Sequence, residues 1–173
     1  LEDAALHLLP KVEGAYCFVM CDNDTIYAAR DPYGVRPLSL GRLERGWVIA
    51  SETCALDIVG ASYVRDIEPG EFVTINASGV HSRHFAEPRH ARCIFEHVYL
   101  ARPDSYLNGH SVNSTRVGIG RRLAKEHPCD GDLVIPVPES GMPAAVGYAQ
   151  ESGIPFAQGL TKNSYVGRTF IQP

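Results

Sequence analysis

The sequence lacks any long apolar run. Its longest runs are about six to eight residues, whereas a helix that crosses a bilayer needs roughly 20. It also lacks an excess of positive charge, because 16 Lys and Arg stand against 20 Asp and Glu. Nucleic acids and anionic membranes both attract clustered positive charge, so neither is expected as the main partner.

The sequence also does not have the low hydrophobicity of disordered proteins, so intrinsic disorder is excluded. Apolar residues make up 45% of the 173 residues and charged residues 21%, with a net charge of −4. Disordered chains combine few apolar residues with a high net charge. The composition predicts a folded protein of one large domain or two small ones.

Cysteine is present without a disulfide pattern. The five cysteines are an odd number, none forms a Cys-x-x-Cys pair, and Cys17, Cys21 and Cys54 fall inside apolar runs. A free Cys in such a run behaves as a small buried hydrophobe. This usage favours the reducing cytoplasm over a secreted disulfide scaffold.

Both ends of the sequence suggest a longer polypeptide. Leu1 is not an initiator Met, and no signal-peptide pattern opens the chain. The last residues end directly after an apolar-aromatic stretch. We therefore expect this chain to be a segment of a larger protein.

The first ninety residues follow a strand-and-turn pattern. Residues 14–21 form an apolar run of strand length, and a hairpin to residues 25–29 is expected across the Asp22-Asn23-Asp24 turn. Further strands are predicted at residues 47–50 and 71–75. A short helix is predicted at residues 53–59, with Ser51 as its N-cap.

After about residue 90 the pattern changes to alternating strands and helices. Residues 111–127 predict an amphipathic helix that ends before Pro128. Residues 132–137 predict a buried strand, residues 142–152 a helix, and residues 154–160 another strand. A strand, helix and strand in this order predict the βαβ unit of an open parallel sheet. We place the domain boundary near residues 88–92.

Three segments carry residues suited to chemistry. The turn Val137-Pro138-Glu139-Ser140-Gly141 lies between a predicted strand and helix, where backbone N–H groups attract anions, although an ordinary tight turn is the simpler interpretation. The polar loop from Lys162 to Thr169 could close over an anionic substrate or be an ordinary solvated loop. For residues 30–38, structural support is the favoured role, with Arg30 paired to Asp31 or a neighbouring carboxylate.

His90, Cys93 and His97 would share one face of a helix and could then bind zinc. Residues 93–100 equally suit a strand, which would place His90 and Cys93 on opposite faces. Zinc is therefore disfavoured here.

Taken together, several strings resemble the amidophosphoribosyltransferase family, also called glutamine phosphoribosylpyrophosphate amidotransferases. They are RDPYGVRPLSLG, VIASETCALD, RDIEPGEFV, CIFEHVYLARPDS, VIPVPESG and KNSYVGRTFIQP. The likeness runs from about Lys11 to Pro173. The resemblance implies an enzyme that makes 5-phosphoribosylamine from glutamine and phosphoribosyl pyrophosphate, the first committed step of de novo purine synthesis.

The resemblance also implies a fold in two parts. Residues 1–90 resemble the later part of an N-terminal-nucleophile (Ntn) glutaminase, a sandwich of antiparallel sheets between helices. Residues 91–173 resemble the connection and the first βα units of a type I phosphoribosyltransferase, which has a parallel sheet. The expected fold class is thus α+β followed by α/β.

Most of the family's catalytic groups are expected outside this chain. The nucleophilic Cys and the groups that hold glutamine belong upstream of Leu1, and the paired acids of the phosphoribosyl-binding strand belong downstream. No catalytic residue is therefore assigned within residues 1–173, and these residues alone are expected to be inactive.

A few roles carry over by position. The resemblance implies a substrate-binding loop with Lys162, Tyr165 and Arg168, a Mg²⁺ ligand at Ser140, and an ammonia channel lined by Tyr99, Phe170 and Ile171. Cys93 matches the first Cys ligand of a [4Fe–4S] cluster in one branch of the family. Other members keep a Cys there without a cluster, so both alternatives stay open.

The resemblance further implies a cytoplasmic homo-oligomer inhibited by purine nucleotides. Two rival interpretations remain. One is a degenerate, non-catalytic paralogue that binds phosphoribosyl or nucleotide ligands. The other is a different Ntn-type glutamine amidotransferase, which the ARPDS and KNSYVGRTFIQP strings disfavour because the glutaminase sandwich does not supply them.

Overall fold

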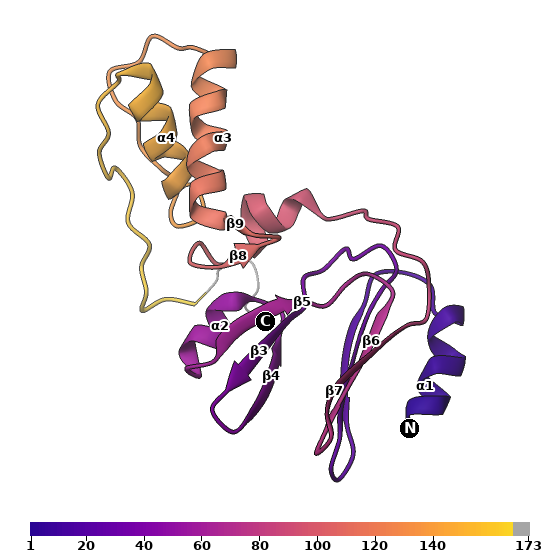
Figure 1. Ribbon diagram of the computed structural model, residues 1–173. Coiled ribbons are helices and arrows are strands. Elements are labelled where there is room, and N and C mark those ends of the chain that lie inside the picture. Colours follow the sequence, from indigo (N-terminus) through magenta and orange to yellow (C-terminus); the bar gives the residue numbers. More distant parts are fainter. Residues whose placement is uncertain (168–173) are drawn as a thin grey trace. The chain divides into compact units, whose positions relative to one another are not determined.

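The computed structural model describes residues 1–167, which divide into two compact units. The first unit is Leu1–Val112 and the second begins at Asn113 (Figure 1). This division lies later in the chain than the boundary predicted near residue 90. Several residues between Arg89 and Tyr106 hydrogen-bond to earlier parts of the first unit, such as Pro32 and Thr53.

The first unit contains two larger antiparallel sheets and one small hairpin. One has four strands in the order β1-β2-β6-β7, and the other has three in the order β4-β3-β5. The strands are β1 (Cys17–Cys21), β2 (Ile26–Arg30), β3 (Ser39–Leu43), β4 (Gly46–Ala50), β5 (Ser62–Asp66), β6 (Glu71–Asn76) and β7 (Gly79–His84). The predicted hairpin is confirmed as β1 and β2, in register from Cys17 opposite Arg30 to Cys21 opposite Ile26.

Apolar side chains on alternate positions of β2 and β6 build two separate cores. Tyr27, Ala29 and Phe72 face helix α1 (Glu2–Leu8) and the 3₁₀ turn η1 (Leu9–Lys11). Ala28 and Val73 point to the other face and pack with residues of and beside the second sheet, such as Leu40. Both faces of these central strands are therefore buried, as the two-residue side-chain period of a strand allows.

Helix α2 (Thr53–Ile58) packs on the three-stranded sheet, where Leu56 lies against Gly41. The short helix predicted here is confirmed, but its predicted N-cap, Ser51, is wrong. Glu52 occupies the cap position with an extended backbone. Ser51 lies one residue too early, and its side chain is exposed.

The last part of the first unit is a connection that contains a π-helix, η2 (Glu96–Leu100), and a small hairpin of β8 (Tyr106–Leu107) and β9 (His110–Ser111). Residues 93–100 are therefore not a strand. Ala101, Leu107 and Val112 form a small apolar cluster beneath this connection.

The second unit contains helices α3 (Val112–Glu126, whose first residue belongs to the first unit) and α4 (Met142–Ser152), and both were predicted. The predicted strands at 132–137 and 154–160 reduce to one parallel bridge, between Val134 and Phe156. The first is also not buried, since Leu133, Ile135 and Val137 are exposed. A strand of a parallel sheet is buried only when neighbours and helices cover it, and one bridge does not provide that cover.

Within residues 1–167, no helix combines the length and the apolar character needed to cross a membrane.

Candidate functional site

The turn at residues 31–37 is organised from inside by Arg30. Its guanidinium is buried and donates to the carbonyl oxygens of Arg36 at 2.8 Å, Ile67 at 2.7 Å and Gly34 at 3.1 Å. Asp31 is also buried and accepts from the backbone N–H of Tyr33 at 2.9 Å. The structural role predicted for this segment thus has a geometric basis, but Arg30 binds carbonyl oxygens, where a carboxylate partner was expected.

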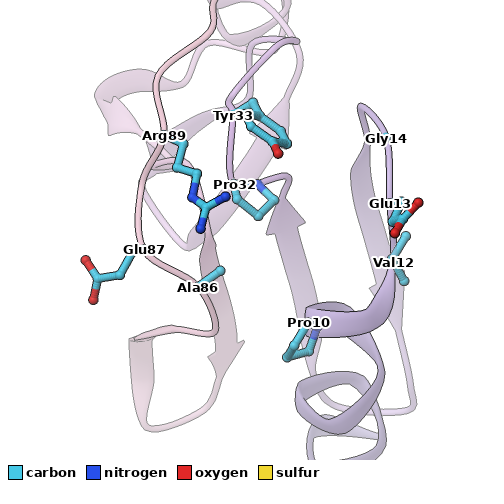
Figure 2. A pocket seen from close by; sticks show the side chains of 9 residues that line it. All are labelled: Pro10, Val12, Glu13, Gly14, Pro32, Tyr33, Ala86, Glu87 and Arg89. Carbon is cyan, nitrogen blue, oxygen red and sulfur yellow. The ribbon is translucent and has the colours of Figure 1, made fainter.

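A cavity of about 480 Å³ opens beside this turn. Figure 2 shows that its lining comes from three segments: the end of η1 and the residues after it, the turn, and the strip that follows β7. The lining residues are Pro10, Val12, Glu13, Gly14, Pro32, Tyr33, Ala86, Glu87 and Arg89. The third segment is held by bonds from the N–H of Arg89 to Pro32 O at 2.7 Å and of Ala91 to Tyr33 O at 2.8 Å.

The lining of this cavity combines two carboxylates, one guanidinium and one phenol. Such a mixture suits a small polar molecule, or a polar stretch of polypeptide, better than an apolar ligand. Among its described lining residues there is no Cys, Ser or Lys, so they provide no thiol, aliphatic hydroxyl or amine nucleophile. Sequence reasoning missed this cavity because its three segments are far apart in the chain.

Cys93 and Tyr99 lie on the connection, in the first unit. Cys93 is half-buried, and its N–H donates to Val35 O at 3.4 Å. Tyr99 lies on the π-helix, is 55% exposed and stacks on Phe95 with ring centroids 5.2 Å apart. Single-turn π-helical segments are frequent at functional sites. The predicted channel role of Tyr99 stays a prediction.

Glu96, on the same π-helix, is a buried carboxylate paired with Arg36 at 2.5 Å. Burial raises the pKa of Glu96, and the Arg36 guanidinium partly opposes that rise. The ion pair ties the connection to the end of the Arg30 turn, so the two segments are fixed to each other.

In the second unit the structure brings together two of the predicted segments. The 137–141 turn leads into α4, with bonds from Gly141 N–H to Val137 O and from Met142 N–H to Glu139 O, both 3.2 Å. Lys162 lies 3.8 Å from the Glu139 carboxylate. A loop cation and the helix-entry turn therefore lie at the same place, and the predicted anion site there stays a prediction.

Ser140 is half-buried in this turn, and Tyr165 in the following loop is fully exposed. Arg168, Phe170 and Ile171 lie outside the described residues, so their predicted roles stay predictions.

No group of three or more His, Cys, Asp or Glu side chains placed to hold a metal occurs in the described part of the chain, residues 1–167. The donors near Ser140 are its hydroxyl and the Glu139 carboxylate. Mg²⁺ takes six oxygen ligands, but it commonly keeps waters and binds substrate phosphates. The side chains of Ser140 and Glu139 could supply only part of such a shell, and Cys93 would need cluster ligands from elsewhere.

The chain is similar to known proteins along its whole length. Residues 2–57 match the glutamine amidotransferase domain family. The amidophosphoribosyltransferases of Mycobacterium bovis and Mycobacterium tuberculosis are 70% identical over 173 residues, which is 100% of this chain and 33% of theirs. That of Synechococcus elongatus is 54% identical over 166 residues, 93% of this chain and 34% of its own.

Two solved structures share the fold. The allosteric regulatory enzyme of purine biosynthesis gives a TM-score of 0.95 at 45% identity, over 99% of this chain and 37% of that one. Glutamine phosphoribosylpyrophosphate amidotransferase from B. subtilis, complexed with ADP and GMP, gives 0.94 at 45% identity, over 99% and 38%. The chain spans about a third of the length of the curated relatives it matches. The family resemblance found in the sequence is thereby confirmed.

Proposed function

We propose that this chain is a segment of an amidophosphoribosyltransferase, the enzyme that transfers the amide nitrogen of glutamine to phosphoribosyl pyrophosphate. The observation that carries the proposal is 70% identity over all 173 residues to enzymes of that name. In this reaction glutamine is hydrolysed to glutamate and ammonia. The ammonia then attacks the ribose C1 of phosphoribosyl pyrophosphate, and pyrophosphate leaves with the bonding electron pair.

The first unit is assigned to the later part of the Ntn glutaminase sandwich. Its support is the stack of two antiparallel sheets with α1 and η1 packed on the first and α2 on the second, together with the family match at residues 2–57. The nucleophilic Cys and the residues that hold glutamine are assigned to parts of the enzyme outside this chain. The role of this unit is then to build the scaffold on which those groups lie.

The second unit is assigned to the start of the phosphoribosyltransferase domain. Its support is the turn at residues 137–141 that leads into α4, and the cation of Lys162 beside it. Ser140 would be one ligand of a Mg²⁺ ion that enters with the substrate diphosphate. When bound, that ion neutralises charge on the leaving pyrophosphate. Lys162, Tyr165 and Arg168 are assigned to the loop that covers the substrate.

An apolar passage between the two reactions is assigned to Tyr99, Phe170 and Ile171. Apolar walls pass neutral ammonia and disfavour ammonium, because a charged ion loses its hydration there. We derive no step through a [4Fe–4S] cluster, since Cys93 alone cannot hold one. The purine-nucleotide inhibitors, the homo-oligomer and the cytoplasmic location belong to the same proposal. The B. subtilis relative was solved with ADP and GMP, which supports the nucleotide part.

The test is an assay of the full-length protein that carries this segment. We expect phosphoribosylamine and pyrophosphate to form only when phosphoribosyl pyrophosphate is present together with glutamine or ammonia. Glutamine hydrolysis without any use of phosphoribosyl pyrophosphate would instead identify a different amidotransferase. Nucleotide binding without either reaction would identify the non-catalytic paralogue.

A further inference from the structure

Glu52 lies at the start of α2, but its side chain hydrogen-bonds to a distant segment of the chain. It occupies the N-cap of α2, where a carboxylate commonly accepts from the first helix amides. Among the described residues its side chain makes no such capping bond. Its Oε2 accepts instead from the N–H of Arg102 at 2.8 Å and the hydroxyl of Ser105 at 2.7 Å.

Thr53, the next residue, extends this contact. Its Oγ1 accepts from the N–H of Tyr106 at 2.8 Å. Ser105 is completely buried, so its hydroxyl is shielded from water at the bond to Glu52. We call the three bonds from Arg102, Ser105 and Tyr106 to Glu52 and Thr53 the Glu52 bridge. It joins segments about fifty residues apart in the chain.

The hydrogen-bonded path continues to the end of the first unit. Ser105 O accepts from the N–H of Val112 at 3.0 Å. Val112 is fully buried with Ala101 and Leu107, and it is both the last residue of the first unit and the first residue of α3. The bridge therefore fixes the point at which the chain leaves the first unit.

We propose that Glu52 is a positioning residue that couples the two half-reactions, an inference that rests on the proposed function. Ammonia made in the glutaminase part reaches the transferase part only if the chain leaves the first unit at a defined place and in a defined direction. Transfer between sites depends on such geometry, and small displacements have large effects. Glu52 acts through Arg102 and Ser105, whose positions it fixes.

The test compares three rates in the full-length enzyme: glutamine hydrolysis, amine formation from glutamine, and amine formation from free ammonia. In Glu52→Ala we expect the amine formed per glutamine hydrolysed to fall by at least about fivefold, because one lost hydrogen bond corresponds to roughly that factor and the substitution removes two. Glutamine hydrolysis and ammonia-dependent synthesis should stay within about twofold of the unmodified enzyme. The missing nitrogen should appear as free ammonia.

Two further variants separate positioning from folding. Glu52→Gln keeps an oxygen acceptor in the same place and should restore most of the yield. Ser105→Ala removes a single hydroxyl and should also lower the amine formed per glutamine hydrolysed. This variant can replace Glu52→Ala in the test if Glu52→Ala does not fold. Glu44→Ala, an exposed carboxylate in the turn between β3 and β4, is the matched control and should leave the yield unchanged.

An unchanged yield in both Glu52→Ala and Ser105→Ala would overturn the inference. An equal loss of all three rates would also overturn it, because it would show a purely structural role. If the unmodified full-length protein makes no amine from either nitrogen source, the proposed function fails and the inference fails with it. That result is distinct, since it appears before any substitution is made.

Discussion

The guanidinium of Arg30 donates to the carbonyl oxygen of Ile67 at 2.7 Å, across 37 positions of sequence. This bond joins the end of β2, in one sheet, to the residue that follows β5, in the other. The same guanidinium holds the turn that borders the cavity, through Gly34 and Arg36. One buried cation therefore fixes both the junction of the sheets and the shape of the turn.

Replacing Arg30 by Lys should destabilise the protein by about 2–4 kcal/mol, because a hydrogen bond to a charged group contributes about 1.5–3 kcal/mol and a single ammonium cannot reach all three carbonyls. Denaturant unfolding of the full-length protein measures the loss. Arg45→Lys, in the exposed turn after β3, should change the free energy of unfolding by less than about 0.5 kcal/mol. Equal effects of the two substitutions would contradict the role given to Arg30.

The ionisation of Glu71 makes the free energy of unfolding depend on pH in the acid range. Burial disfavours its charge, but bonds from Arg65 at 2.8 and 2.6 Å, Ser82 at 2.5 Å and the N–H of Glu68 at 2.6 Å outweigh burial and lower its pKa below the ordinary 4.5. A carboxyl whose pKa is lower in the folded state contributes stability above that ordinary value. The contribution is lost as the pH falls through the lowered pKa.

We therefore expect Glu71→Gln to be less stable than the unmodified protein by about 2–3 kcal/mol near pH 7. The difference in the free energy of unfolding between the two proteins should become smaller as the pH falls below 4.5. Urea unfolding at several pH values checks this. A difference that stays constant with pH would show that the ionisation of Glu71 contributes nothing.

Helices α3 and α4 approach each other closely through glycines. A Cβ on Gly120 would overlap the backbone of Ala144, whereas a Cβ on Gly118 would meet no atom within 4 Å. Gly120→Ala should thus cost about 1–3 kcal/mol or more through overpacking. Gly118→Ala should stabilise α3 by up to about 1 kcal/mol, because alanine is the better helix former. Thermal unfolding of both variants tests the helix contact, and a shift in the same direction would refute it.

Lys162 should affect the transferase reaction alone. Lys162→Ala removes the cation beside the 137–141 turn and should raise the KM for phosphoribosyl pyrophosphate by about threefold to tenfold, a typical effect for one charge-assisted contact. Glutamine hydrolysis should stay unchanged. Lys125→Ala, an exposed cation on α3 paired with Glu151, serves as the control. An unchanged KM in Lys162→Ala would remove this residue from the substrate site.

Cys17 should resist alkylation in the folded protein. Burial raises the pKa of its thiol to about 11, so only about one molecule in a thousand carries the thiolate at pH 8. Peptide mass spectrometry after iodoacetamide treatment should show Cys17 modified far more slowly than in urea, with a rate that rises as the pH approaches 11. Labelling of Cys17 as fast in the folded as in the unfolded protein would show that its partial burial does not protect the thiol.

Local sequence patterns correctly located about half of the elements, but they gave no signal for α1, β3, β5 or β7. The hairpin, α2, α3 and α4 follow from turn residues and apolar periodicity, which depend on neighbours a few positions away. The Ser51 cap, the strand alternative at 93–100 and the buried strand at 132–137 were wrong. The Ser51 cap missed the start of the helix by one residue. The other two errors concern segments whose structure depends on contacts with distant parts of the chain, which a local pattern does not contain.

Some parts of the candidate site were also predicted from local motifs, whereas others depend on the fold. Motifs in the chain identified the 137–141 turn and Lys162 separately, and the fold brought Glu139 and Lys162 within 3.8 Å. The cavity beside Tyr33 and the bonds of Glu52 to Arg102 and Ser105 carry no sequence signal, because their members lie in separate segments.

The sequence by itself determined the family resemblance, the change from antiparallel strands to alternating strands and helices, and the residue types available at each turn. These properties depend on residue order and on local backbone preferences. Only the tertiary structure decided that Arg30 binds carbonyl oxygens, that Glu52 reaches across to Ser105, and that the first unit extends to Val112. The physical reason is that hydrogen bonds and burial depend on distance in space, and folding alone brings distant residues of the chain together.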